Sequence, residues 1–270
     1  IWKAFSMVKI VLGLIVLAIL LTGALYFLQR TMLFPMPADA LPQRLPENVE
    51  KILLAQGHAL FVNARNPQRE RRPVIVYAHG NAEVAHWSIE RFSHFTEQGM
   101  HVLLLEYPGY ADSSGSPSYG AITKSALAAF DQIVKRDDVD DTKIIVYGRS
   151  IGGGPACLLA AQREVAALVL ESTFSSLAEL VTEKGYPSFL LRDRFENVAI
   201  VNELTIPLLI YHGTRDTLIP FEHAKRLIKV ARNGILQSAD CGHNDCPRPW
   251  GALHRFFVDL EMIDSHLPAE

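Results

Sequence analysis

The chain has 270 residues, of which 49% are hydrophobic and 20% are charged. This balance excludes a disordered chain and is typical of one globular domain with a large buried core. The formal net charge of -3, from 26 Lys and Arg against 29 Asp and Glu, provides no basic surface for nucleic acid.

The first long feature is an uncharged apolar segment at 10–28, IVLGLIVLAILLTGALYFL. As a helix it reaches about 28 Å, close to the thickness of a bilayer core. A cleaved signal peptide has a shorter apolar stretch, and a soluble helix would be amphipathic. We therefore expect residues 1–30 to form a single-pass membrane anchor. Lys3 and Lys9 before it and Arg30 after it favour a cytoplasmic N-terminus and an exported domain, although Lys3 does not count if Met7 is the natural start.

A proline-rich linker is predicted at 31–48, because prolines at 35, 37, 42 and 46 are incompatible with a helix or a central strand. The remaining segment, 49–270, contains short apolar runs that predict eight strands, at 51–54, 60–63, 74–77, 102–106, 144–147, 168–170, 208–211 and 235–238. From the third run onward the spacing allows a crossover helix, such as 122–136. The pattern predicts an α/β domain with a mostly parallel eight-stranded sheet flanked by helices.

Residues 172–205 interrupt this alternation, because this segment between two predicted strands is longer than a single crossover helix requires. We expect part of this segment to form a small cap region. Its Phe174, Phe189 and Leu190 are candidates for a substrate surface, and ordinary core packing is the alternative for each of them.

The strongest local motif is Gly148-Arg149-Ser150-Ile151-Gly152, between the strand at 144–147 and a helical stretch from Pro155. A serine on such a turn has a strained backbone that projects its hydroxyl, and the residues two positions away must be small. Gly148 and Gly152 meet this need. We interpret Ser150 as a nucleophile; the alternative is a glycine-rich packing turn.

A serine nucleophile needs a base, and the base needs an acid that holds one tautomer. After the seventh strand, His243 lies in a loop that follows a strand, whereas His223, His254 and His266 fall in helices or the tail. Asp216 follows the strand at 208–211. One strand and one helix separate it from His243, so both loops meet at one sheet edge. We predict Asp216 as the acid, with Glu171 as the alternative.

Two backbone N–H groups are needed to bind the oxyanion of an acyl-transfer intermediate. The residue after the nucleophile, Ile151, is expected to supply one. Asn81 in His79-Gly80-Asn81, after the third strand, is expected to supply the other. His79 is interpreted as a structural hydrogen-bonding residue at the end of that strand.

The segment from about Val49 to the C-terminus resembles the Bem46-like branch of the α/β-hydrolases, which includes membrane-associated acyl-protein thioesterases. The matching motifs are YAHGNAE at 77–83, LLLEYPGYADSSGSP at 103–117, YGRSIGGGPA at 147–156, RFENVAIVNELTIPLLIYHGTRDTLIPFEHAKRL at 194–227 and GHND at 242–245. The resemblance implies hydrolysis of acyl esters or thioesters by Ser150, Asp216 and His243, without a metal or organic cofactor. Ala111 stands where the family usually has glycine, beside Tyr110, a further candidate substrate contact.

Two of the three cysteines, Cys241 and Cys246, flank His243, while Cys157 is expected to be buried. The pair is compatible with free thiols in the cytosol or with a disulfide in an exported domain. A metal site is disfavoured, because it lacks a fourth ligand and would consume the base.

The sequence predicts a membrane-anchored serine hydrolase that cleaves acyl esters or thioesters. Its expected partners are the lipid bilayer and the acyl substrate. A serine peptidase or amidase and a catalytically weak, membrane-tethered interaction protein are the alternatives. The acyl chain length and the head group of the substrate are left open, as is the oligomeric state of the protein.

Overall fold

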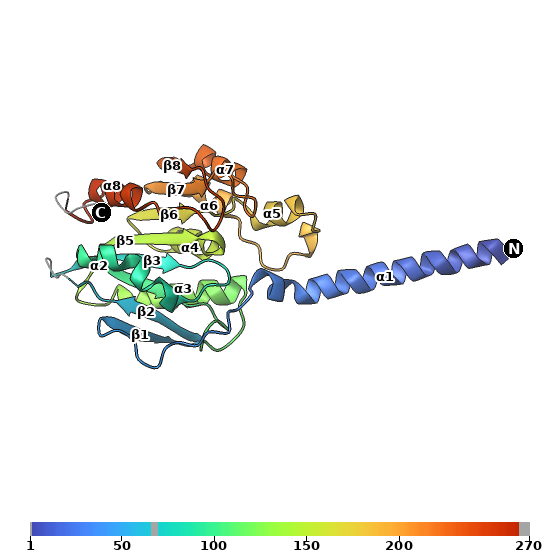
Figure 1. The fold of residues 1–270 in the computed structure, drawn as a ribbon, viewed down its shortest axis with the longest axis horizontal. Coiled ribbons are helices and arrows are strands. Elements are labelled where there is room, and N and C mark those ends of the chain that lie inside the picture. The colour runs from blue at the N-terminus through green and yellow to red at the C-terminus, as the bar shows by residue number, and fades with distance from the viewer. Residues whose placement is uncertain (1, 66–69, 265–270) are drawn as a thin grey trace.

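A computed structural model of the chain describes residues 2–65 and 70–264. Within these residues a layered α/β body carries one projecting helix, α1 (Figure 1). The helices and strands, in chain order, are α1 (Trp2–Leu33), β1 (Val49–Leu54), β2 (Gly57–Val62), β3 (Arg72–Ala78), η1 (Ala85–Ser88), η2 (Glu90–Phe92), α2 (Ser93–Glu97), β4 (His101–Leu105), α3 (Tyr119–Ile133), β5 (Val139–Arg149), η3 (Ser150–Gly152), α4 (Gly153–Gln162), β6 (Ala167–Glu171), α5 (Leu177–Glu183), η4 (Ser188–Leu190), α6 (Asn197–Glu203), β7 (Leu208–Gly213), α7 (Glu222–Val230), β8 (Gly234–Ala239) and α8 (Trp250–Asp259).

The eight strands of the described residues form one sheet in the order β1-β2-β4-β3-β5-β6-β7-β8. The pairings β1–β2 and β2–β4 are antiparallel, and all the others are parallel. The predicted fold class is thus confirmed. β5 begins at Val139 rather than at 144, because Asp140, Asp141 and Thr142 are polar and exposed or half-buried and hide its first half from an apolar pattern.

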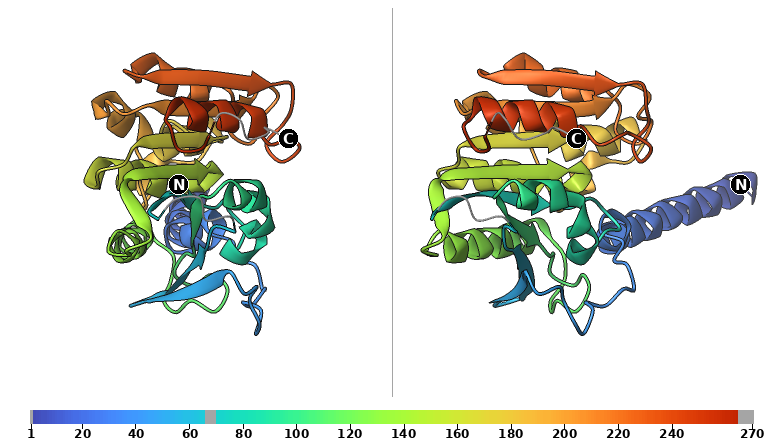
Figure 2. Two further views of the ribbon diagram at one scale, coloured as in Figure 1. Left: turned by 90° about the vertical axis from the view of Figure 1, so that its left-hand side faces the viewer. Right: turned by 60° about the vertical axis from the view of Figure 1, so that its left-hand side comes forward.

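The core lies on both faces of the sheet, because successive strand residues point to opposite sides. In β3, Val74 and Val76 pack under α3, α4, α6 and α7, whereas Ile75 and Tyr77 pack under α2 and α8. Figure 2 shows these helical layers on the two sides of the sheet. A third apolar cluster, which includes Phe34 and Ile151, lies at the carboxyl ends of the parallel strands.

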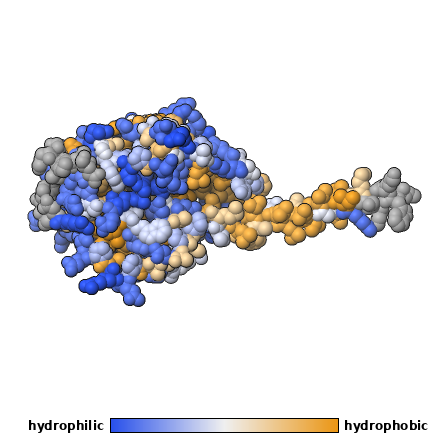
Figure 3. Space-filling view, in the orientation of Figure 1, coloured by the Kyte–Doolittle hydropathy of each residue, from blue (hydrophilic) through white to orange (hydrophobic). Residues whose placement is uncertain are grey.

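Helix α1 continues to Leu33, so it extends beyond the expected limit at 30. Among the described residues it is the one helix long and apolar enough to cross a membrane, over Met7–Leu33. From Met7 to Met32 most of its apolar side chains are exposed, and this surface continues onto the body where the two meet (Figure 3).

The segment 172–205 has two parts with different positions. Helix α6 packs against α4 and α7 and covers the sheet. Helix α5 and the short η4 instead lie beside the end of α1 (Figure 1). We call residues 177–191, which contain α5 and η4, the cap segment.

Candidate active site

The motif around Ser150 forms a tight turn between β5 and α4. Ser150 has a φ of +53°, a conformation that costs non-glycine residues about 1–2 kcal/mol. A Cβ added at Gly148 would lie 2.4 Å from the Gly152 carbonyl oxygen, and one added at Gly152 would lie 2.1 Å from that of Ala78. Close approach of main chain therefore explains both glycines.

Three side chains form a hydrogen-bonded chain at the carboxyl ends of the strands. Ser150 Oγ lies 3.0 Å from His243 Nε2, and His243 Nδ1 lies 2.7 Å from Asp216 Oδ2. They follow β5, β8 and β7, so three separate strands present them at one edge. The structure brings these three predicted residues together in the geometry of a nucleophile, base and acid.

Asp216 is held by its own loop. Its Oδ1 accepts hydrogen bonds from the N–H groups of Leu218 at 2.9 Å and Ile219 at 2.8 Å. Burial by itself would raise the pKa of this carboxyl, but hydrogen bonds from His212, His243 and the Ile219 N–H outweigh it and hold the pKa well below its usual value. The carboxylate is therefore ionised and can orient His243 at neutral pH.

The predicted oxyanion donors lie on neighbouring segments. The contact of Gly152 with the carbonyls of Ala78 and His79 brings the start of the Asn81 loop against the turn that contains Ile151. The Asn81 side chain is fixed from two sides. Its Nδ2 donates to the Leu33 carbonyl at 2.7 Å, and its Oδ1 accepts from the Tyr110 hydroxyl at 3.0 Å. These contacts fix the loop that carries the Asn81 N–H.

Arg149, beside Ser150, is a residue that the sequence analysis missed. It is 6% exposed, and its guanidinium donates to the His243 carbonyl at 3.2 Å and to Asn244 Oδ1 at 3.1 Å. The same group donates to Glu83 Oε1 at 2.5 Å. Arg149 thus ties the histidine loop to the body. A charged residue at the end of an apolar strand, between Gly148 and Ser150, was the available signal.

His212 was also missed. Its Nε2 bonds the Ile219 carbonyl at 2.8 Å and lies 3.4 Å from Asp216 Oδ2. It is fully buried at the end of β7. A histidine four residues before the acid, in an otherwise apolar strand, was the only signal for it.

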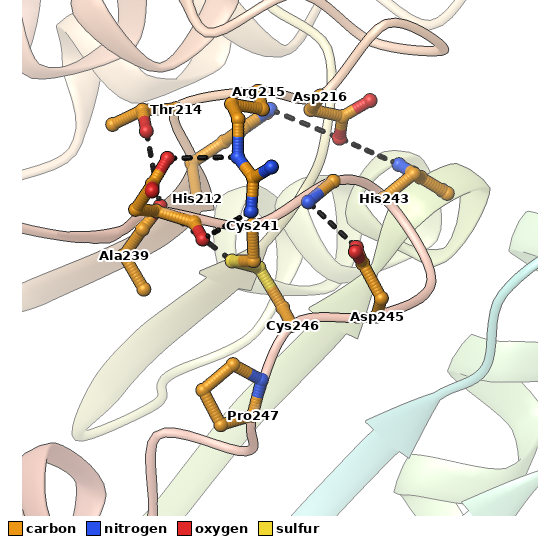
Figure 4. The surroundings of a disulfide bond; sticks show 12 residues. His212, Thr214, Arg215, Asp216, Ala239, Cys241, His243, Asp245, Cys246 and Pro247 are labelled. Carbon is orange, nitrogen blue, oxygen red and sulfur yellow. Dashed lines mark hydrogen bonds and ion pairs between the residues drawn. A yellow bond between two sulfur atoms is a disulfide. The ribbon is translucent and has the colours of Figure 1, made fainter.

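The histidine loop is closed by a disulfide between Cys241 and Cys246, with the two Cα atoms 5.0 Å apart. Figure 4 shows His243 and Asp245 on this short loop. The N–H of Gly242 donates to Asp245 Oδ1 at 2.6 Å, and the Arg215 N–H donates to the Cys241 carbonyl at 2.9 Å. The pair is therefore not available as thiolate metal ligands. Cys157 is a buried free thiol, and burial raises its pKa.

Other titratable candidates have structural partners. Glu171, the alternative acid, bonds Tyr147 and lies 2.6 Å from Arg248, so it is not joined to His243. His79 contacts Glu106 at 3.1 Å, in agreement with a structural role. His223 is buried on α7 and contacts Ser175 at 2.8 Å. His254 is buried on α8, and His266 lies outside the described residues.

The four candidate substrate contacts lie in different environments. Tyr110 and Phe174 are buried in the third apolar cluster, so neighbouring side chains cover them. Phe189 is 76% exposed and projects from the cap segment. Leu190 lines an apolar groove beside α1. The structure therefore does not gather these four on one surface.

Residues 73–205 match a family model described as the alpha/beta hydrolase fold. The uncharacterized protein YfhR of Escherichia coli is 30% identical over 168 residues, 58% of this chain and 57% of that protein. The chain thus spans less than two-thirds of that relative. The uncharacterized protein Rv2307c of Mycobacterium tuberculosis is 31% identical over 202 residues, 71% of this chain and 72% of that protein.

Protein bem46 of Schizosaccharomyces pombe is 28% identical over 249 residues, 83% of this chain and 82% of that protein. Among solved structures, a Pyrococcus furiosus esterase superposes with a TM-score of 0.65 and 16% identity, over 84% of this chain and 97% of that one. At that identity the superposition shows the fold. The sequence relatives, the fold and the strand-to-helix serine turn agree, and the chain belongs to the α/β-hydrolase family, in its Bem46-like branch.

Proposed function

We propose that the chain is a membrane-anchored serine hydrolase that cleaves carboxyl esters or thioesters of acyl chains. The observation that carries this proposal is the hydrogen-bonded chain from Ser150 through His243 to Asp216. A hydroxyl within 3.0 Å of an imidazole nitrogen, whose other nitrogen bonds a carboxylate, is the arrangement that acyl transfer to serine requires.

In the proposed reaction, the Ser150 hydroxyl transfers its proton to His243 Nε2 as its oxygen attacks the substrate carbonyl. The Asp216 carboxylate stabilises the imidazolium through Nδ1–H. The N–H groups of Ile151 and Asn81 stabilise the oxyanion, and His243 then protonates the leaving alcohol or thiol. Water activated by His243 hydrolyses the acyl-enzyme and restores Ser150.

Anchoring through α1, with the hydrolase domain on the exported side, is part of the proposal. The apolar surface of Met7–Leu33 supports insertion in a bilayer. The Cys241–Cys246 disulfide supports an oxidising compartment, because disulfides persist there and are rare in the cytosol. Protease added to intact cells is expected to degrade the domain. Full protection of the domain, with degradation after lysis, would contradict export.

The activity is tested by labelling the full-length protein with a fluorophosphonate and by measuring hydrolysis of p-nitrophenyl esters and acyl-coenzyme A thioesters. We expect labelling and turnover that disappear in Ser150→Ala. Ser125→Ala, a buried serine on α3, is the matched control and should retain both. Equal labelling of Ser150→Ala would refute the nucleophile assignment. Turnover of aminoacyl amides without turnover of esters would favour the peptidase alternative, and no turnover at all would favour the interaction protein.

A further inference from the structure

An apolar groove of about 250 Å³ lies between the last turns of α1 and the cap segment. One wall consists of α1 residues, including Leu25, Met32 and Leu33. The facing wall includes Leu180 and Leu190. The groove is distinct from the triad, because Ser150 does not line it. An elongated apolar ligand is the chemistry that such a lining recognises.

The wall formed by α1 is held in place by polar contacts to the cap side. Arg30 forms two hydrogen bonds with Asp193, at 2.7 and 3.0 Å, and Asp193 is 1% exposed. Gln29 donates to the Leu190 carbonyl at 2.9 Å and accepts from the Arg192 N–H at 2.8 Å. Helix α1 is therefore fixed against the cap segment, unlike a tether on a free linker.

Two residues join the groove to the active-site loops. Leu33 lines the groove, and its carbonyl accepts the hydrogen bond from Asn81 Nδ2, in the loop of the proposed oxyanion donor. Leu218 also lines the groove, and its N–H donates to Asp216 at 2.9 Å. The inner side of the groove thus borders both the oxyanion loop and the acid loop.

The length of α1 places the groove at the bilayer surface. About 20 helical residues cross a hydrocarbon core of about 30 Å, and counted from Ile10, the first residue after Lys9, they end at Gln29. The α1 wall of the groove, from Leu25 to Leu33, then straddles the boundary between the hydrocarbon core and the headgroups. Arg192 stacks over Tyr26 at 5.3 Å, and the nearby Tyr186 is 45% exposed, as is typical of a membrane interface.

We propose that this groove binds the acyl chain of a membrane-resident ester or thioester, which enters directly from the bilayer with α1 as one wall of the binding site. The inference rests on the proposed function and deepens it by locating the surface that binds the acyl chain and the route by which the chain enters from the bilayer. Because Ser150 does not line the groove, we expect only long acyl chains to reach it from the active site, so that the groove acts on chain-length selectivity.

The test uses the full-length protein in mixed detergent micelles, with p-nitrophenyl butyrate and p-nitrophenyl palmitate as substrates. Leu180→Trp and Leu25→Trp fill the groove from opposite walls. The matched controls are Thr182→Trp on α5 and Leu28→Trp on α1, neither of which lines the groove. We expect the palmitate-to-butyrate ratio of kcat/KM to fall at least about tenfold in Leu180→Trp and in Leu25→Trp. This is the effect of losing contact with about two methylene groups of the acyl chain. The controls should retain the parent ratio.

An unchanged ratio in both groove variants would overturn the proposal, as would an equal fall in the controls. Failure of the proposed function gives a different result, because then the parent protein shows no Ser150-dependent turnover of butyrate. Inhibition of butyrate hydrolysis by free palmitate adds a readout of binding. Its inhibition constant should rise about tenfold in Leu180→Trp and stay unchanged in Thr182→Trp.

Discussion

The edge of the sheet that carries Ser150, Asp216 and His243, here called the triad edge, is built differently from the groove beside α1. At the triad edge, Ser150 and Asp216 are almost fully buried and are fixed by main-chain contacts at short range. The groove is formed by partly exposed apolar side chains from segments far apart in the sequence. The difference teaches that the backbone sets the geometry of Ser150 and Asp216, whereas side chains set the shape of the groove proposed to select the acyl chain. Changes at the edge should lower turnover of every acyl chain length, and changes at the groove should alter selectivity.

The largest effect is expected for Asp216→Asn. The amide keeps the volume of the carboxyl but no longer holds His243 in the tautomer that accepts the serine proton, so kcat should fall by about 10⁴ for butyrate and palmitate alike. Asp240→Asn is the control, since Asp240 is an exposed residue paired with Arg215. A loss confined to palmitate would break the distinction between the two regions.

Asp216→Asn also gives a prediction about how the unfolding free energy depends on pH. The folded-state pKa of Asp216 is depressed below its ordinary value of 3.8, so its ionised form stabilises the folded protein fully above that value. This contribution is lost as the pH falls toward the folded-state pKa. The difference in unfolding free energy between parent and Asp216→Asn should therefore stay constant at neutral pH and shrink progressively as the pH falls below about 5. Urea titrations at several pH values measure it, and a difference that grows on acidification would contradict the prediction.

Gly152→Ala comes next. Its new methyl group would lie 2.1 Å from the Ala78 carbonyl oxygen, so β3 and the serine turn must separate. We expect a loss of about 3 kcal/mol in unfolding free energy, with kcat reduced at least about a hundredfold for both chain lengths. Gly120→Ala is the control, because nothing lies within 4 Å of its Cβ position on α3 and alanine favours a helix. Normal stability of Gly152→Ala would refute the close-approach explanation.

Arg149→Met tests whether Arg149 supports the triad by holding the histidine loop in position. Removing the guanidinium frees the His243 carbonyl, so kcat should fall about 10- to 100-fold for both esters, while KM changes less than about threefold. Arg149→Lys should restore part of the rate. Arg163→Met removes a more exposed pair with Asp131 and serves as the control. A change in KM alone would contradict a positioning role.

Arg30→Met acts on the groove region. It leaves the buried Asp193 without its guanidinium and loosens α1 from the cap segment. The palmitate-to-butyrate ratio of kcat/KM should fall about three- to tenfold, because one wall of the groove is no longer fixed. The exposed Arg232→Met is the control. An equal decrease for the two esters would show that α1 supports the triad itself and not only the groove.

The smallest effect is expected for Ala111→Gly. Ala111 has a φ of +45°, which is unfavourable for alanine and explains why glycine is usual there. Glycine should raise the unfolding free energy by about 0.5–1 kcal/mol, with the chain-length ratio unchanged. Thermal unfolding of parent and variant measures this, and a destabilised Ala111→Gly would show that the alanine methyl contributes more by packing than it costs in strain.

The sequence predicts the inner strands because they are buried and consist largely of Val, Ile and Leu. The turn at Ser150 is also readable, because its glycines are dictated by contacts within a few residues. Arg149 and His212 were missed, since their roles depend on loops that only the folded sheet brings near. The contacts of Gln29 with Leu190 and of Arg30 with Asp193 join residues more than 160 positions apart, and no local pattern encodes them.

The continuity of α1 from Met7 to Leu33 has a practical consequence for any version of the proposed hydrolase that is produced without this helix. Under the proposed function, such a protein would retain Ser150, His243 and Asp216 and would hydrolyse short esters, yet it would lack one wall of the groove proposed to bind the acyl chain. Screens of truncated relatives with short chromogenic esters would then rank enzymes by intrinsic reactivity and miss the preferences that the anchored forms have in a membrane.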